Sequence, residues 1–424
     1  MFEVRECREV PPELRRGGRA FWLAQRKVEE EVRAIIDRVA REGDAALSAL
    51  SRELDGVETP ATGFRVPLAK LEEAAAAVPE ELKKALLKAR DNVARFSATR
   101  PANTFTFNPA GAFLGTLSLP LRRVGVYIPG GRAAYPSSVV MNVVPAQAAG
   151  VEEIALATPP AGGYGHPLIL GAAYLLGVHE VYAVGGAQAI AALALGTETI
   201  PAVDKVVGPG NAYVAAAKRL LFGCVGIDSV AGPSEVLIVA DESARAPLVA
   251  RDLIAQAEHD SEARAYLVTT SRRLAQEVAA RVEEELRSLP RAGLARAALA
   301  ASAAYVVPDL TTALALANAW APEHLELMVA DPWALLPHVR NAGAVFLGPF
   351  TPEALGDYVA GPSHVLPTAG TARFASPLGV EQFQKRVNVV AYGRAAWTAD
   401  EPAARVLAQA EGLAAHARAL EGRG

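Results

Sequence analysis

Short apolar runs alternate with amphipathic segments from Val124 onward, and this alternation is the strongest pattern in the chain. Runs of three to six apolar residues predict buried strands, while apolar residues at three- and four-residue spacing predict helices. The first part predicts strands at 125–129, 153–158, 180–184 and 205–207, with helices from Pro136 and at 168–176, 188–195 and 212–221. Strand–helix alternation of this kind indicates an α/β domain with a mainly parallel sheet.

A second run of the same kind starts at Glu235, after a junction near Ala231-Gly232-Pro233. It predicts strands at 235–240, 265–269, 305–307, 325–329 and 344–347, with helices near 243–257 and at 274–286, 311–320 and 333–339. We therefore predict an α/β fold of two Rossmann-like parallel-sheet modules, residues 124–234 and residues 235–376.

The flanking segments have other patterns. Residues 21–100 are helical in pattern, with strong helix formers at 68–95, and residues 104–121 predict a β-hairpin around Asn108-Pro109-Ala110-Gly111. We expect residues 1–123 to pack with the second module. Residues 398–420 predict a terminal helical arm, with Pro402 near its start and Gly412 inside it, whose apolar stripe needs a surface to cover it. We expect the C-terminal region, residues 377–424, to be exchanged between the subunits of a homodimer.

Composition narrows the class of protein. The chain has 424 residues, 51% hydrophobic and 21% charged, with a formal charge of −4, which are globular values for two or three domains. Without a run of Lys or Arg, a nucleic-acid partner is not expected. Without 18 consecutive apolar residues or an apolar N-terminal segment, we expect no membrane span and no secretion. Cys7 and Cys224 have no CxxC spacing, so we expect a protein of the reducing cytoplasm without a structural disulfide. Any metal site must then use nitrogen and oxygen ligands.

Gln256 and His259 lie three apart in the pattern of the helix that ends near Asp260, so we expect them to share a face. An imidazole nitrogen beside an amide oxygen could hold one metal ion or one polar substrate. Taken alone, such a pair is more often a solvated surface pair.

Three Gly-rich turns follow predicted strands of the first module: Gly130-Gly131, Gly185-Gly186 and Gly208-Pro209-Gly210-Asn211. Each precedes a helix, and free N–H groups at a helix start bind anions. Each turn alone could equally be a simple tight turn, and none has the G-x-G-x-x-G spacing. Three together favour a nucleotide site, with Tyr127, Gln188 and Asn211 as the nearby polar groups.

Further candidates come later in the chain. Glu323 and His324 follow Pro322, so we expect them in a loop, where they could supply two proton-transfer groups or simply be a surface acid and a capping histidine. Asp357, on a predicted short helix, would be a hard oxygen ligand, and His364, in the loop that follows, would be a hydrogen-bonding residue or a ligand. Glu411 and His416, five apart on an ideal helix, diverge by about 140° unless the arm bends at Gly412. His166, His179 and His338 have featureless surroundings and are interpreted as structural.

Together these motifs resemble histidinol dehydrogenases. The resemblance rests on Ile227-Asp228-Ser229-Val230-Ala231-Gly232-Pro233-Ser234-Glu235, Gln256-Ala257-Glu258-His259-Asp260, Ala321-Pro322-Glu323-His324-Leu325, Gly361-Pro362-Ser363-His364 and Glu411-Gly412-Leu413-Ala414-Ala415-His416. It runs in order from about Arg122 to His416. The N-terminal hundred residues fit by length and position but contain no diagnostic motif.

The resemblance implies a four-electron oxidation of L-histidinol to L-histidine through L-histidinaldehyde, with two NAD and one zinc per subunit, as the last steps of histidine biosynthesis. It implies that Gln256, His259, Asp357 and His416 are the zinc ligands, with His416 coming from the other subunit of an intertwined dimer. Tyr127, Gln188 and Asn211 match NAD positions, and Glu323 and His324 match the proton-transfer pair. The substrate positions are matched by Ser234, His364 and Glu411, together with His324 and the four zinc ligands.

The chemistry of these residue types agrees with those roles. One carboxylate and three neutral ligands leave a formal charge of about +1 on zinc, which attracts the neutral imidazole and amine nitrogens of a substrate. A zinc hydrolase or lyase, with Glu323 activating water and the Gly-rich turns binding a phosphate, is the rival enzyme class. A non-catalytic nucleotide-binding protein is the rival outside enzymes.

Overall fold

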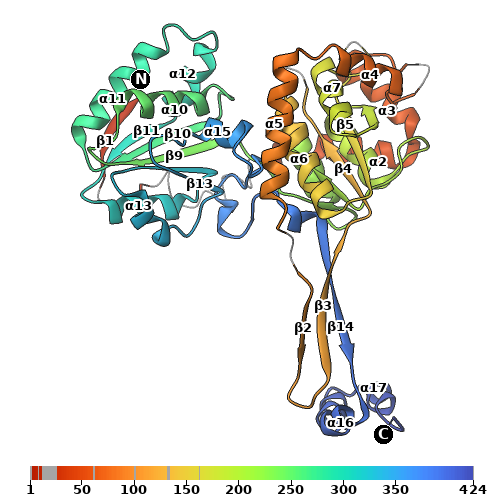
Figure 1. Cartoon of the computed structure of the whole chain (residues 1–424). Coiled ribbons are helices and arrows are strands. Elements are labelled where there is room, and N and C mark those ends of the chain that lie inside the picture. Colours follow the sequence, from red (N-terminus) through yellow and green to blue (C-terminus); the bar gives the residue numbers. More distant parts are fainter. Residues whose placement is uncertain are drawn as a thin grey trace.

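The computed structural model describes residues 2–7, 9–11, 26–60, 63–99, 102–130, 134–161 and 163–423. Figure 1 shows two α/β modules side by side and a long β-ribbon that leaves the first module and ends in two helices. Gly131 of the first Gly-rich turn and the predicted helical residues 21–25 lie outside the described residues.

The first module has a five-stranded parallel sheet in the order β6-β5-β4-β7-β8. Its strands are β4 Arg123–Tyr127, β5 Glu153–Thr158, β6 Glu180–Ala183, β7 Lys205–Val207 and β8 Gly226–Ile227. Its helices are α6 Pro136–Ala149, α7 Pro167–Leu175, α8 Gly186–Leu195 and α9 Ala212–Leu221. All the predicted elements of this run are present, and two apolar clusters cover the two faces of the sheet.

The second module has a six-stranded parallel sheet in the order β1-β11-β10-β9-β12-β13. Its strands are β1 Glu3–Glu6, β9 Glu235–Ala240, β10 Arg264–Thr269, β11 Ala303–Val306, β12 His324–Met328 and β13 Ala344–Leu347. Its helices are α10 Ala246–Ala257, α11 Arg272–Glu285, α12 Ala292–Ala300, α13 Leu310–Trp320, α14 Pro332–Leu335 and α15 Glu353–Tyr358, with a 3-10 turn at Leu336–His338. The sequence pattern did not predict β1, β8 or α12.

The two modules share one strand order. Counted along the chain from the first strand of each run, both sheets read 3-2-1-4-5, with β1 added beside β11 in the second. This is the first part of the doubly wound strand order, in which strands 2 and 3 are added on one side of strand 1 and strands 4 and 5 on its other side. The prediction of two Rossmann-like parallel-sheet modules is therefore confirmed.

The N-terminal helices pack on the first module, so the expected packing of residues 1–123 with the second module is wrong for most of that segment. Helices α2 Glu29–Glu42 and α3 Asp44–Leu50 lie against α8, α4 Leu68–Ala76 against α7, and α5 Glu80–Phe96 against α6. Among the strands and helices that the structure describes in this segment, β1 is the one that joins the second sheet, by pairing with β11. An amphipathic pattern shows which face of a helix is buried but not which surface covers it. The helix formers at 68–95 form two helices, because Pro79 starts α5.

The predicted hairpin forms and gains a third strand. Strands β2 Thr104–Phe107 and β3 Phe113–Pro120 are antiparallel, and β14 Gln384–Ala391 pairs along the whole of β3. The ribbon ends in α16 Arg394–Ala410 and α17 Ala414–Ala419 (Figure 1). Pro402 lies inside α16 rather than near its start. The arm does bend at Gly412, whose φ of 72° is left-handed. None of the helices described is long and apolar enough to span a membrane.

Candidate active site between the two modules

The candidate catalytic residues gather at the amino-terminal edge of the second sheet. Strands β9 and β12 begin at Glu235 and His324, and His324 is paired with Val236 across them. Helix α10 crosses back against the strand direction, so its end at Ala257 reaches the same edge. Gln256 is in the last turn of α10, and Glu323 directly precedes β12. The pair Gln256 and His259 therefore comes close to the pair Glu323 and His324.

His324 is the first residue of a central strand, so the expectation that Glu323 and His324 share a loop is wrong for His324. Helix α13 ends at Trp320, and Ala321 takes a left-handed φ of 58°, which turns the chain sharply. Pro322 does end the helical pattern, but β12 starts only two residues later. The His324 side chain consequently points into the buried face of the sheet that α10 covers.

Gln256 and His259 do not share a helical face, because α10 ends at Ala257 and His259 lies in the following turn. Gln256 is buried, with 1% of its surface exposed. His259 remains accessible, and its Nε2 lies 3.9 Å from Oδ2 of Asp357 on α15. The structure thus brings together three of the four predicted zinc ligands by placing Asp357 near this turn.

The His324 ring is surrounded by oxygen atoms. Nδ1 lies 3.0 Å from the backbone oxygen of Glu235 and 3.7 Å from carboxylate oxygens of Glu323 and Glu353. Nε2 lies 3.7 Å from Oδ1 of Asp357. Donation from Nδ1 to the Glu235 carbonyl would leave Nε2 facing the Asp357 side, as a proton acceptor when the ring is neutral.

Burial and charge act in opposite directions on this pair. Burial by itself lowers the pKa of His324, but the neighbouring acids Glu323, Asp357 and Glu353 raise it to about 10. Burial raises the pKa of Glu323 to about 7, although the charge of His324 opposes that rise. A carboxyl with a pKa near neutrality can both accept and return a proton at the pH of the cell.

Four further acids lie near this edge of the sheet: Glu235, Glu326 and Glu353 are buried, Asp252 is partly buried, and none of them is among the predicted site residues. Burial raises the pKa of Glu235 to about 8 and that of Asp252 to about 6, and it raises the pKa of Glu326 and Glu353 well above the usual range. The sequence does carry a signal, since Glu326 interrupts the otherwise apolar run of β12. Because alternating polar residues in a strand normally face water, that signal alone does not indicate burial.

His364 connects this cluster to the first module. Its Nδ1 lies 2.8 Å from the backbone oxygen of Asp357, and its Nε2 lies 3.1 Å from Oγ of Ser138 on α6. The neighbouring Ser363 hydroxyl donates to the Met141 carbonyl of the same helix. The predicted substrate residue therefore sits where the two modules meet. Ser234 lies directly before β9, at the same edge of the second sheet.

A cavity of about 380 Å³ opens between the modules at this point. Its walls come from α5, from the start of α6 and from the ends of α10 and α15. The lining residues are Leu82, Ala85, Leu86, Ala89, Ala134, Tyr135, Pro136, Ser137, Glu258, His259, Arg291 and Tyr358. The cavity thus joins His259 to the chain that follows β4, the strand that ends at Tyr127.

The predicted cofactor residues lie at the carboxyl edge of the first sheet. Tyr127 ends β4, and its hydroxyl accepts a hydrogen bond from the backbone N–H of Gly186 at 3.1 Å. Gln188 is buried near the start of α8, and exposed Asn211 caps α9 by accepting from the N–H groups of Tyr213 and Val214. This edge beside the strand reversal is where doubly wound sheets bind ligands.

A buried ion pair fixes the third Gly-rich turn. Asp228 accepts from the N–H of Gly208 at 2.8 Å, and Lys218 donates to the Gly208 carbonyl at 2.9 Å while also pairing with Asp228. A Cβ at Gly208, where φ is +114°, would collide with the Tyr127 carbonyl. Hence only glycine fits at this position, and the turn is held against Tyr127.

The arm residues lie apart from all the others. Glu411 and His416 are exposed on either side of the bend at Gly412, at the far end of the ribbon from both modules (Figure 1). Within the described parts of the chain, no group of three His, Cys, Asp or Glu residues is placed to hold a metal. One chain therefore assembles Gln256, His259 and Asp357 without a fourth ligand from its own arm.

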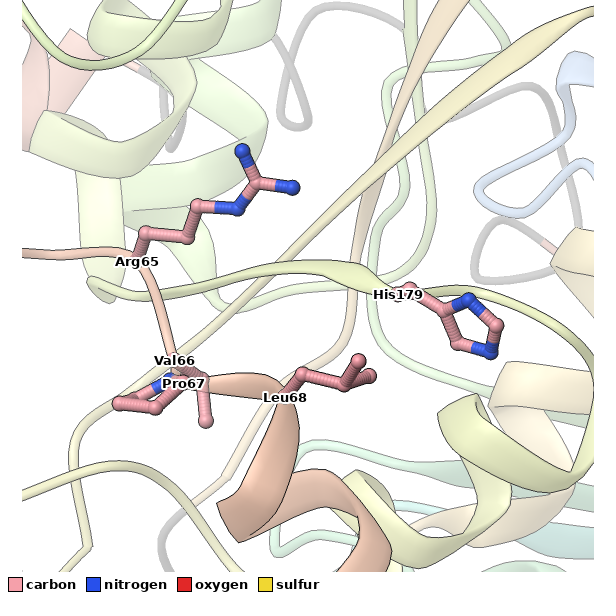
Figure 2. Close-up of a pocket in the computed structure, with 5 residues that line it drawn as sticks. All are labelled: Arg65, Val66, Pro67, Leu68 and His179. Atoms are coloured by element: carbon pink, nitrogen blue, oxygen red, sulfur yellow. The ribbon is translucent and has the colours of Figure 1, made fainter.

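Another cavity, of about 390 Å³, lies at the opposite edge of the first sheet, beside His179 and Arg65. Figure 2 shows its lining residues, which include none of the predicted site residues. His179 packs on Tyr174 with ring centroids 5.2 Å apart, and His166 caps α7 by accepting from the Leu168 N–H.

Comparison with known proteins agrees with the motifs. Residues 22–424 match the family model described as histidinol dehydrogenase. The chain is 51% identical to histidinol dehydrogenase of Moorella thermoacetica over 96% of this chain and 97% of that one. It is 50% identical to the enzyme of Bradyrhizobium diazoefficiens over 95% and 94%. Its fold matches the crystal structure of histidinol dehydrogenase from Elizabethkingia anophelis with a TM-score of 0.91 and 34% identity, covering 99% of this chain and 97% of that one.

The burial of Glu235 predicts a pH-dependent stability that one substitution removes. Its ordinary pKa is 4.5 and its folded pKa is about 8, so between these values only the folded protein retains the proton. The free energy of unfolding therefore falls as pH rises through this window, by up to about 1.4 kcal/mol per pH unit, and this loss is absent below it. Glu235→Gln cannot ionise, so we expect it to lose less stability than the original protein in urea titrations from about pH 5 to about pH 8.

Glu421→Gln, at an exposed carboxyl, is the matched control and should follow the original protein. Equal pH dependence in the Glu235→Gln variant and this control would contradict the assigned pKa shift.

Proposed function

Because the chain belongs to the histidinol dehydrogenase family, we propose that it oxidises L-histidinol to L-histidine through L-histidinaldehyde, with NAD as the electron acceptor and one zinc ion per subunit. The resemblance predicted from the motifs is thereby confirmed at the level of the family. The observation that carries the proposal is the buried Glu323–His324 pair beside Asp357, which also lies next to His259, a lining residue of the cavity that reaches to the chain after β4.

The donor set at this cavity fits zinc. His259 Nε2 and Asp357 Oδ2 already lie 3.9 Å apart, and imidazole, carboxylate and amide oxygen are suitable zinc ligands. Gln256, His259 and Asp357 would hold the ion, with His416 of a second copy as the fourth ligand. When bound, the ion would supply Lewis acidity that holds the amine and imidazole nitrogens of histidinol.

The cofactor would bind at the carboxyl edge of the first sheet. Tyr127, Gln188 and Asn211 line that edge, and the Gly208 turn held by Lys218 and Asp228 lets a ligand approach the backbone closely. NAD bound there would supply the acceptor for a hydride in each of two oxidations. The cavity between the modules adjoins the same edge, so substrate and acceptor could meet without leaving the protein.

His324 and Glu323 would accept protons in different steps of the reaction. Binding of Asp357 to the metal ion would reduce the negative charge that favours the protonated ring, and neutral His324 would then take the proton of the substrate alcohol at Nε2, the nitrogen on the Asp357 side. Glu323, whose pKa lies near neutrality, would take a proton from the water that hydrates the aldehyde. His324 would then accept the proton of the resulting diol. Ser234, His364 and Glu411 would complete the contacts with the substrate.

The exposed ribbon supports a dimer with exchanged arms. Apolar side chains along it face solvent in the single chain, including Phe107 at 67% exposed, and Val406 and Leu407 at 63% each. Contiguous apolar surface of this kind usually contacts another protein. An arm that reaches a second copy would cover this surface and deliver Glu411 and His416 to the partner's cavity.

The first experiment mixes the purified protein, zinc, L-histidinol and excess NAD and follows absorbance at the NADH band. We expect two NADH per histidinol consumed, because the alcohol and the aldehyde are each oxidised once. Protein stripped with a chelator is the control and should regain activity when zinc is added back. A hydrolase, a lyase or a non-catalytic nucleotide-binding protein would give no NADH.

Glu323→Gln and His324→Asn separate the two proton acceptors. With histidinaldehyde as substrate, Glu323→Gln should reduce NADH formation by about 10²–10⁴-fold, because hydration lacks its base, while alcohol oxidation is affected less. His324→Asn should slow both oxidations. An equal loss in both half-reactions of Glu323→Gln, or an unaffected alcohol oxidation in His324→Asn, would refute this division.

Mixed dimers test whether the arm crosses between subunits. His259→Ala and His416→Ala should each abolish zinc binding and activity alone. When the two variants are unfolded together and refolded, a site with both histidines forms only in mixed dimers and only if the arms are exchanged. Random mixing should restore about a quarter of the original activity, since half of the dimers are mixed and each has one intact site. No recovery would show that His416 does not act across subunits.

A further inference from the structure

The side-chain amide of Gln256 is held at one end by a set of hydrogen-bond acceptors. With its nitrogen on this side, the amide donates to Oε2 of Glu353 at 3.0 Å, and it also lies 3.2 Å from the Glu235 carbonyl and 3.1 Å from His324 Nδ1. The opposite orientation would direct the amide oxygen at these acceptors. These acceptors therefore assign the amide nitrogen to this side and the amide oxygen to the opposite side.

An amide nitrogen has two hydrogens, so it can serve two of these three partners. Whenever His324 Nδ1 carries the hydrogen that it donates to Glu235, that ring nitrogen cannot accept another. The Glu235 carbonyl and the Glu353 carboxylate are then the two acceptors. Of these two, only Glu353 is a side chain that evolution or mutagenesis can change.

Orientation matters because the nitrogen of an amide is a poor metal ligand. Its lone pair is delocalised into the carbonyl group, so a hard cation takes the amide oxygen. The oxygen is the end that the acceptors around Gln256 leave free.

We propose that Glu353 is a positioning residue that orients the Gln256 amide so that its oxygen is presented to the metal. The proposal rests on the metal site proposed above. Substitution of a group that orients a metal ligand in this way typically weakens metal binding by about 10–100-fold.

Glu353 is itself held firmly. It is 1% exposed and begins α15, where its backbone N–H donates to Oε1 of Glu326 on β12 at 2.8 Å. Asp252 on α10 lies close enough to Glu326 for the two acids to influence each other's pKa. A Cβ at Gly356 would collide with the Phe346 ring of β13, so α15 lies close against the sheet.

Glu353 and Asp357 lie one helical turn apart and thus share a face of α15. This helix would therefore supply one metal ligand directly and orient a second ligand through Glu353. The positions of Glu353 and Asp357 both depend on how α15 packs against the sheet.

The test measures zinc affinity by competition with a coloured chelator, independently of NAD and substrate. Glu353→Ala removes the acceptor, and we expect zinc to bind about 10–100-fold more weakly. Glu353→Gln can still turn its carbonyl toward the Gln256 nitrogen, so its affinity should stay within about threefold of the original protein. Glu326→Gln, a buried acid that keeps the acceptor for the Glu353 N–H, is the matched control.

A double-mutant cycle shows whether Glu353 acts through Gln256. Glu353→Ala combined with Gln256→Ala should bind zinc no more weakly than Gln256→Ala alone. Unchanged affinity in Glu353→Ala, additive losses in the double variant, or an equal loss in Glu353→Gln would each overturn the proposal. Should Glu353→Ala fail to fold, Glu353→Asp withdraws the carboxylate by one methylene and is expected to weaken zinc binding in the same way.

His259→Ala and Asp357→Ala separate this inference from the metal site itself. If neither variant loses zinc, the metal site and the role of Glu353 both fail. If both lose zinc while Glu353→Ala does not, only the role of Glu353 fails.

Discussion

The chemistry of this protein depends on keeping one imidazole and several carboxyl groups out of water at the same edge of a sheet. An isolated buried charge is very unfavourable, so each group must be neutral, paired or hydrogen-bonded. His324 is stabilised in its charged form chiefly by Glu323 and Asp357, whereas Glu235 and Glu353 are held towards their neutral forms by burial. The same arrangement gives proton-transfer groups with separated pKa values, which the proposed reaction requires.

The two modules have the same strand order but use opposite edges. The cofactor candidates lie at the carboxyl edge of the first sheet, as is usual for this architecture. The acid–base cluster lies at the amino edge of the second sheet, where β9 receives the chain from the first module and β12 follows α13. Asp228, in the segment that joins the modules, also fixes the Gly208 turn. The segment that joins the modules thus runs from the edge with the cofactor candidates to the edge with the acid–base cluster.

Much of the fold could be predicted from periodicity. Parallel strands covered on both faces form mostly apolar runs, and β5, β7, β9 and β13 begin and end at the predicted residues. Strand β14 was missed because it lies on a solvent-exposed ribbon, where polar and apolar residues are mixed along the strand and most side chains are exposed. The helices of the N-terminal segment were predicted, but their partner was not, because periodicity contains no information on which surface they cover.

The candidate site was predictable in composition but not in arrangement. Histidines and acids in specific motifs identified the residue set, and its metal, cofactor and substrate roles remain proposals. The entry of His324 into β12 was missed because Pro322 suggested a longer loop. Glu353 and Glu326 were overlooked because a lone acid in a strand or at the start of a helix usually faces solvent. Only tertiary packing turns these acids inward.

The distribution of burial also explains why such a site would be divided between subunits. Gln256, His324 and Glu353 are held by the core of the second module, so their positions cost little additional ordering when a ligand binds. Glu411 and His416 lie at the exposed end of a ribbon, and an isolated ribbon of this kind would move too freely to place a ligand precisely. Covering its apolar face with a second copy would restrict that motion. In such a dimer the rigid half of the site would come from the fold of one chain, and the precision of the other half would come from association.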